Sequence, residues 1–307
     1  MTVLEQLPLG AHVCVIRLRS LGDCVLTTPA LSLLNQWRPD LKIGVSVEDR
    51  FAPVLAGSDV ITTIVPPSWL AVRRWKPQLC VNLHGGTRSQ WMTALSGAKW
   101  RAGFAHHSMT FAYNLKIGRA QSILGVNRTV HTAEHLASAF FALGVPVQDV
   151  PRARLHADGV DVQPPQKAYA VLHPFAAAPQ KRWPAERFCE IARYLELWNI
   201  TPVFLAASED DAMPFTAHTV FRGSLSKVKT LLANAALFLG NDSGPAHIAA
   251  AFGIPSVVLF GPSNPSIWGP WQTESEIVVA PDGLDRVSVS RVIAALEKLS
   301  VLEGAHA

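Results

Sequence analysis

The most constraining feature of this chain is an alternation of β-rich runs with helix-length segments, which occurs twice along the sequence. In the first half, apolar runs at 13–18, 43–47 and 79–83 are separated by stretches with helical spacing, the longest of which is 24–37. Strands that alternate with helices predict a parallel sheet with both faces covered by helices.

The same alternation starts again after residues 146–167, a segment rich in Pro, Asp, Gly and Gln that has no sustained periodicity and is typical of a linker. We therefore predict an α/β protein of two Rossmann-like, doubly wound domains, residues 1–155 and 156–307. Ligands of such domains lie at the carboxyl ends of the strands, here in a cleft between the two domains. The last predicted helix, 287–299, either completes the second domain or packs back on the first.

Composition places the chain among globular proteins, since 49% of its 307 residues are hydrophobic and 16% are charged. It contains no uninterrupted apolar stretch of the roughly 20 residues that a membrane-spanning helix needs. The cysteines form no CxxC pair and lie in or beside apolar segments, which predicts reduced thiols in a cytosolic protein without a zinc site or disulfide. They are Cys14, Cys24, Cys80 and Cys189.

Charge is divided unevenly between the two halves. Residues 1–155 hold 16 Lys and Arg against 8 Asp and Glu, whereas residues 156–307 hold 11 against 15. A basic first half suits an anionic substrate or an anionic membrane surface, and the alternative is a solvated surface without functional meaning.

The strongest local signal is a strand end followed by a helix start with the sequence Asp242-Ser243-Gly244-Pro245 and then His247. Asp242 or Ser243 can cap the helix, and Pro245 suits its first turn. Gly244 lets a ligand approach the backbone closely. The free N–H groups and the helix dipole then predict an anion site that matches a diphosphate, to which His247 can add a donor. The alternative is an ordinary capped helix with a packed histidine.

A second signal follows the first strand, where Gly22 permits a tight turn and Asp23 lies at the start of the first helix. A carboxylate at that place can accept a proton from a sugar hydroxyl, although Asp23 can also do no more than cap its helix. The segment contains no GxGxxG, which argues against a dinucleotide-dependent dehydrogenase.

Two further segments of the second half carry candidate residues. Lys181 follows a strand end and can neutralise a phosphate, or it can belong to a solvated basic pair. The run 208–211, Ser-Glu-Asp-Asp, follows the predicted strand 202–206 and can bind ribose hydroxyls or Mg²⁺, or simply enrich a helix start in acids. The loops 84–88 and 260–271 are additional candidates for a ligand site.

Taken in order, these segments resemble glycosyltransferase family 9, the lipopolysaccharide heptosyltransferases. The resemblance extends from about residue 13 to residue 299, and its specific motifs are 21–23 and 242–247. The segments that carry it are 16–23, 27–31, 83–103, 181–184, 241–247, 260–262 and 268–270.

The resemblance implies a GT-B fold, with the acceptor on the first domain and a nucleotide-sugar donor on the second. It also implies an inverting transfer that needs neither a metal nor a cofactor. Asp23 matches the family's proposed general base, and the acceptor contacts expected in the basic half are Arg19 and Arg88. The donor-binding positions implied are Lys181, Asp210, Asp242, Ser243, Gly244 and His247.

This sequence departs from the family pattern in one place and leaves another open. Some members carry hydroxyl residues where this chain has Ala176 and Ala177, a difference that bears on the phosphate contacts there and on the identity of the donor. The acid expected to bind the donor ribose is Glu209, Asp210 or Asp211, of which we favour Asp210.

The resulting prediction is transfer of heptose from ADP-heptose to an anionic, lipid-linked or oligosaccharide acceptor of the lipopolysaccharide inner core, with no role for nucleic acid. The expected location is the cytoplasm, with peripheral contact at the inner face of the cytoplasmic membrane as an open alternative. Other readings are a different nucleotide-sugar donor, a nucleotide-sugar epimerase, and a non-catalytic nucleotide-sugar binder. The sequence leaves the oligomeric state open.

Overall fold

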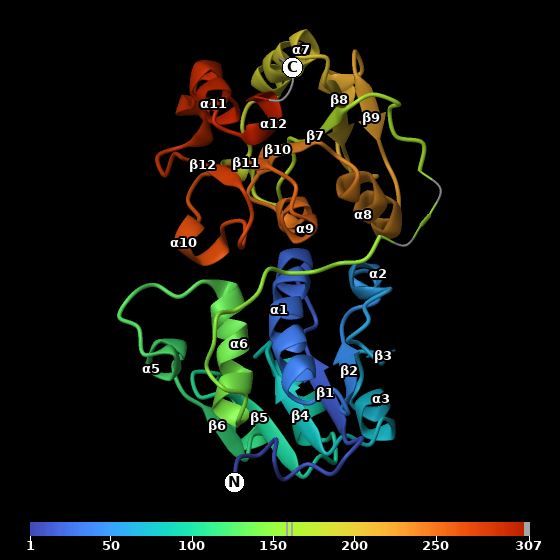
Figure 1. Cartoon of the computed structure of the whole chain (residues 1–307), viewed down its shortest axis with the longest axis vertical. Coiled ribbons are helices and arrows are strands. Elements are labelled where there is room, and N and C mark those ends of the chain that lie inside the picture. The colour runs from blue at the N-terminus through green and yellow to red at the C-terminus, as the bar shows by residue number, and fades with distance from the viewer. Residues whose placement is uncertain (158, 161, 304–307) are drawn as a thin grey trace. The chain divides into compact units, whose positions relative to one another are not determined.

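The computed structural model describes residues 1–157, 159–160 and 162–303, and the chain divides into two compact units, Met1–His156 and Ala157–Ala307 (Figure 1). Each unit contains one six-stranded sheet in which every strand pair is parallel. The α/β class predicted from the alternation is therefore confirmed. The predicted linker, 146–167, contains no helix or strand in its described part, and its residues 158 and 161 lie outside the described residues.

The first unit has the strand order β3-β2-β1-β4-β5-β6. The chain runs outward from β1 in one direction and then from β4 in the other, so the order reverses between β1 and β4. In open parallel sheets this reversal, the topological switch point, is where ligands bind. The strands are β1 (His12–Ile16), β2 (Lys42–Ser46), β3 (Thr63–Val65), β4 (Leu79–Asn82), β5 (Trp100–Phe104) and β6 (Leu115–Ile117).

Helices flank this sheet, and α1 and α6 lie side by side (Figure 1). Val72 and Met92 turn inward from two other helices, α3 and α4, and pack with Cys14 and Ile16 of β1 in one hydrophobic cluster. The helices are α1 (Leu21–Trp37), α2 (Ala52–Leu55), α3 (Trp69–Arg74), α4 (Thr87–Ala94), the 3-10 helix η1 (Thr110–Ala112), α5 (Ala120–Leu124) and α6 (Thr132–Leu143).

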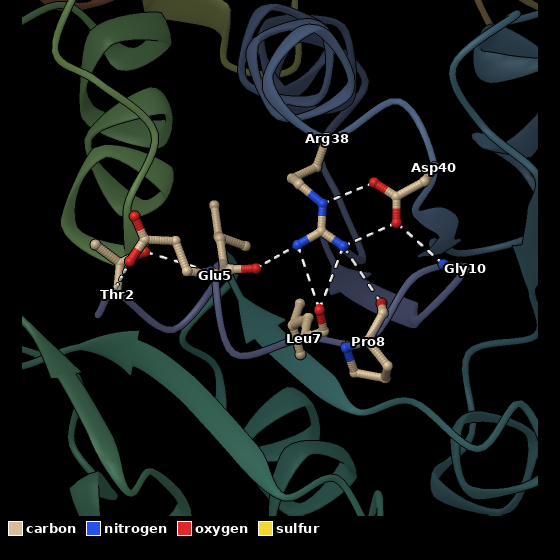
Figure 2. Close-up of polar contacts among 8 residues, drawn as sticks. Thr2, Glu5, Leu7, Pro8, Gly10, Arg38 and Asp40 are labelled. Carbon is tan, nitrogen blue, oxygen red and sulfur yellow. Dashed lines mark hydrogen bonds and ion pairs between the residues drawn. The ribbon is translucent and has the colours of Figure 1, made fainter.

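The segment that precedes β1 is held by Arg38 at the end of α1 (Figure 2). Arg38 donates to the carbonyl oxygens of Leu4 and Pro8 and forms a bidentate pair with Asp40, at 2.7 and 2.8 Å. Asp40 also accepts the Gly10 N–H at 3.0 Å. The guanidinium lowers the pKa of the Asp40 carboxyl from 3.8 to about 2. Together, the hydrogen bonds of Arg38 and Asp40 hold the segment that leads into the central strand.

The second unit repeats the pattern with the order β12-β11-β10-β7-β8-β9, and its switch point lies between β7 and β10. The helix α11, which lies within the predicted last helix 287–299, contributes Val292 and Leu296 to the core of this unit, where they join Trp183 and Phe188. The strands are β7 (Tyr169–His173), β8 (Thr201–Leu205), β9 (Thr219–Phe221), β10 (Leu237–Asn241), β11 (Ser256–Phe260) and β12 (Ser275–Val279). The helices are η2 (Pro179–Lys181), α7 (Ala185–Leu197), η3 (Met213–Phe215), α8 (Leu225–Ala233), α9 (Gly244–Phe252), α10 (Pro265–Trp268), η4 (Leu284–Arg286), α11 (Val289–Leu296) and α12 (Ser300–Glu303).

Two findings bear on the predictions made from composition. The four cysteines are free thiols. In the described part of the chain, the helices are too short or too polar for any of them to cross a bilayer.

Candidate functional site

Asp23 lies at the switch point of the first unit, in the first turn of α1. Ser20 is the N-cap of that helix, and one carboxylate oxygen of Asp23 accepts the Ser20 N–H at 3.1 Å and the Ser20 hydroxyl at 3.2 Å. The other oxygen pairs with the guanidinium of Arg17. Asp23 therefore caps its helix, which was one reading of the sequence, and it is also a paired carboxylate whose side chain is 14% exposed.

Arg17 connects the ends of the two strands that form this switch point. It follows β1 directly, and while it pairs with Asp23 it also donates at 2.5 Å to the carbonyl oxygen of Leu83, which follows β4. The sequence motif included Arg17 but gave it no role, because its partner at Leu83 lies 66 positions along the chain. An arginine in the same short motif as the candidate base was the signal that could have identified it.

A cluster of histidine rings, which the sequence analysis did not identify, lies after β4 and β5 and on α6. The His135 ring stacks on Phe104 with 4.1 Å between centroids, and the His106 and His107 rings lie 4.9 Å apart. Burial, together with charge on neighbouring groups, lowers the pKa of His107 and of His135 to about 4. These two rings are therefore neutral near pH 7 and act as polar hydrogen-bonding surfaces rather than as cations.

The two predicted acceptor contacts, Arg19 and Arg88, have exposed side chains. The pKa of His84 is lowered by burial and by the charges of two arginines, of which Arg19 is one, so Arg19 lies close to the end of β4. Arg88 lies in the first turn of α4, donates to the carbonyl oxygen of Pro67, and is 3.9 Å from a carboxylate oxygen of Glu48.

In the second unit the predicted helix start is formed by α9. Ser243 is its N-cap with extended backbone, and Pro245 lies in its first turn. The Ser243 hydroxyl is 3.0 Å from Nδ1 of His173, the last residue of β7, and burial lowers the pKa of His173 to about 4. The Ser243 hydroxyl, which follows β10, thus connects that strand to the end of β7. His247 lies one turn further along α9 and is buried.

Lys181 and Asp242 meet although 61 positions separate them. The Lys181 ammonium is 2.7 Å from the Asp242 carboxylate, and the two side chains are 32% and 8% exposed. Gly261 allows this approach, because a Cβ at that position would lie 2.9 Å from the carbonyl oxygen of Gln180, next to Lys181 in η2. The structure therefore brings together two of the predicted donor-site residues.

Asn241 fixes the segment that carries Lys181, and the sequence analysis assigned it no role. Its buried amide donates at 2.7 Å to the carbonyl oxygen of Pro174 and accepts at 3.1 Å from the backbone N–H of Trp183. A polar residue at the end of an otherwise apolar strand was the signal, because a buried amide requires partners.

Asp210 lies apart from this pair. It follows β8, which borders β7 on the side away from the switch point. Its carboxylate accepts the Ala207 N–H at 2.8 Å, and its carbonyl oxygen accepts from Arg222 at 2.7 Å. Among interactions of the described residues, none joins Asp210 to Lys181 or Asp242, so its contact with a donor stays a prediction. The described residues also contain no group of three or more His, Cys, Asp or Glu arranged to hold a metal ion.

Comparison with known proteins yields consistent matches. The family model described as glycosyltransferase family 9 (heptosyltransferase) matches residues 70–290. Lipopolysaccharide heptosyltransferase 1 of Pseudomonas aeruginosa is 27% identical over 290 residues, which cover 84% of this chain and 81% of that protein. A glycosyl transferase family 9 structure from Veillonella parvula superposes with a TM-score of 0.81 at 22% identity and covers 96% and 97% of the two chains. The E. coli heptosyltransferase WaaC with ADP-2-deoxy-2-fluoro heptose gives 0.75 at 19% identity and covers 94% and 99%.

Proposed function

Because the chain belongs to glycosyltransferase family 9, the heptosyltransferase family, and has the GT-B fold, we propose that it transfers heptose from ADP-heptose to an acceptor sugar. The proposed acceptor is an anionic, lipid-linked sugar of the lipopolysaccharide inner core. The reaction takes place in the cytoplasm or at the inner face of the cytoplasmic membrane. It inverts the configuration at the transferred carbon.

The observation that carries this proposal is the position of the two motifs within their own sheets. Asp23 follows β1 beside β4, and Asp242 follows β10 beside β7. Each motif therefore lies at the topological switch point of its unit, where open parallel sheets bind ligands. A site for the acceptor in one unit and for the donor in the other is what the proposed transfer requires.

The start of α9 suits the diphosphate of the donor. The N–H groups of its first turn are directed out of the helix, and the helix dipole places partial positive charge there. Lys181 is close enough to Asp242 to be held in place and exposed enough to reach a phosphate oxygen as well. With Ser243, Gly244 and His247 beside them, these groups stabilise the negative charge that develops on ADP as it leaves.

In the chemical step, the Asp23 carboxylate takes the proton of an acceptor hydroxyl. The acceptor oxygen attacks C1 of heptose while the bond from C1 to the diphosphate oxygen breaks, and ADP leaves with the electron pair. Attack on the face opposite the leaving group inverts the configuration at C1. Arg19 and Arg88, with exposed guanidinium groups, bind anionic groups of the acceptor.

The variant Asp23→Asn tests the base most sharply, because asparagine can still accept the hydrogen bonds from Ser20 but takes up no proton. We expect kcat to fall by roughly 100-fold to 10,000-fold, the usual contribution of a general base, while ADP affinity is retained. The matched control Ser20→Ala weakens the cap but leaves the carboxylate, so its turnover should stay close to the unmodified level. If Asp23→Asn keeps its turnover, the assignment of the base is wrong.

A thermal-shift panel of nucleotide diphosphates and their sugars tests the donor. ADP and ADP-heptose should raise the melting temperature, because a ligand that binds only the folded state stabilises it. A shift with UDP or its sugars instead would indicate another donor. Product formed without added acceptor would indicate an epimerase, and binding without any turnover would indicate a non-catalytic binder.

A further inference from the structure

Residues 60–133 form a continuous stretch of the first unit without a carboxylate side chain. Between Asp59 and Glu134 the chain contains nine Lys or Arg residues and neither Asp nor Glu. The net positive charge of the first half is concentrated in this stretch. Such a surface attracts anionic partners over the range of a Debye length.

The same stretch exposes large apolar side chains on three neighbouring elements. Trp69 and Leu70 lie on α3, Trp91 and Leu95 on α4 and its C-cap, and Phe111 on η1. These five side chains, which we name the α3–α4 face, are between 40% and 66% exposed. α4 contacts both α3 and η1, and the Trp91 and Phe111 rings meet edge to face with 5.8 Å between centroids.

The exposure on these helices is not the result of a shortage of core contacts. Val72 of α3 and Met92 of α4 are buried against the sheet, so each helix packs its inner side and presents a second apolar side to solvent. Isolated exposed apolar residues are ordinary on a protein surface, whereas a contiguous group on adjacent elements marks an interaction surface.

Three cationic side chains lie next to this face. Arg73, Lys76 and Lys99 line one open pocket of about 450 Å³ between the end of α3 and the loop that follows α4. Among the described residues, those that line this pocket include no Asp or Glu. Arg73 lies one helical turn after Trp69 on α3 and both side chains are exposed, so cationic and apolar side chains occupy the same side of this helix.

We propose that the α3–α4 face, together with the pocket cations Arg73, Lys76 and Lys99, docks on an anionic lipid bilayer. Aromatic and leucine side chains insert at the level of the headgroups, and the cations bind lipid phosphates. The residue composition of this surface favours a bilayer over a protein partner. Protein interfaces are depleted in lysine, whereas lipid-binding surfaces combine Trp and Phe with Lys and Arg. The surface contains none of the residues assigned to transfer. The inference rests on the proposed function, which it deepens by naming the surface that contacts the membrane.

Co-sedimentation of the full chain with vesicles tests the proposal. We expect binding to phosphatidylcholine vesicles that contain phosphatidylglycerol, weak binding to phosphatidylcholine alone, and loss of binding as salt is added. The triple variant Arg73→Gln, Lys76→Gln and Lys99→Gln should bind the mixed vesicles roughly 100-fold more weakly, since each cation near the membrane contributes about a fivefold factor. The variant Trp91→Ser with Phe111→Ser should also weaken binding by at least roughly tenfold.

Controls come from exposed residues outside the stretch. Lys227→Gln on α8 and Trp37→Ser at the end of α1 should leave vesicle binding unchanged. Far-UV circular dichroism during heating shows whether each variant remains folded. Turnover with a water-soluble acceptor should stay unchanged in the α3–α4 variants, which separates failure of docking from failure of the transfer site.

Three results would overturn the proposal. One is equal sedimentation with neutral and mixed vesicles, or none with either. Another is unchanged binding in the folded triple variant. The third is a lipid-free dimer, seen by light scattering, that the Trp91 and Phe111 substitutions dissociate while vesicle binding is absent, because the face would then contact a second copy of the chain.

Discussion

The ion pair between Lys181 and Asp242 allows a quantitative prediction of how substitutions in the proposed donor site change the free energy of unfolding. Its two charged atoms are 2.7 Å apart, and Asp242 is almost buried while Lys181 is about a third exposed. Replacing Lys181 by alanine leaves a carboxylate in a poorly solvated position. Replacing Asp242 by asparagine removes that charge and keeps the shape of the side chain.

The burial of the pair sets the size of the effect. Loss of one partner from a fully buried pair costs roughly 3 to 5 kcal/mol, whereas fully exposed pairs contribute about 0 to 1 kcal/mol. Since one partner here is buried and the other is partly exposed, we expect Lys181→Ala to lower the free energy of unfolding by about 2 kcal/mol. In the double variant the carboxylate is absent, so the cost of losing Lys181 should fall to about 1 kcal/mol.

Urea unfolding of the four chains in this cycle, followed by circular dichroism, measures the coupling. If the losses of stability in the two single variants add up to that of the double variant within roughly 0.5 kcal/mol, as expected of independent sites, the two side chains are not energetically coupled and the argument is refuted. Titration with ADP tests the second role of the lysine. Lys181→Ala should weaken ADP binding by roughly tenfold, as loss of one charge-assisted contact implies, and an unchanged affinity would remove Lys181 from the donor site.

The remaining predictions concern other contacts. Arg17→Ala should lower kcat by more than about tenfold with KM little changed, because Arg17 holds the proposed base in position. Added guanidinium should restore part of the lost rate. If guanidinium does not change the rate of this variant, Arg17 has only a structural role. The Asp40 carboxyl has a lowered pKa in the folded chain, so its contribution is present above about pH 4 and is lost as pH falls toward 2. Arg38→Ala should remove this contribution, which solvent screening of a surface pair limits to about 1 kcal/mol, in melting experiments between pH 5 and 2, and parallel curves for the two chains would contradict it. Gly261→Ala should weaken ADP binding, measured by calorimetry, because the new methyl group pushes against the Gln180 carbonyl oxygen.

The fold was predictable where strands are central and fully buried. The apolar run predicted at 79–83 contains β4 (Leu79–Asn82), whose four residues are all buried, because a strand covered on both faces is a continuous apolar run. The edge strands β6, β9 and β12 were not predicted, and neither was β5, which lies beside β6. These strands are only partly buried and include polar residues such as Arg101 and Lys116, so they show no apolar run.

The candidate site divides in the same way. Local sequence sufficed to place Asp23 and Ser243 at helix starts, because capping depends on neighbours within one turn. It did not reveal that Asp23 is paired with Arg17, nor that the His107 and His135 rings gather nearby. Such contacts depend on which strands are neighbours, and an alternation of strands and helices does not specify the strand order.

The sequence by itself therefore determined the class of fold, the two helix starts and the chemistry that each can support, since these follow from periodicity and from residues a few positions apart. Only the tertiary structure decided which charges meet. Lys181 reaches Asp242 because η2 and the end of β10 converge at one switch point, and Asp210 is kept from them because β8 lies on the far side of β7. The physical reason is that strand order, rather than distance along the chain, sets the neighbours of each strand end.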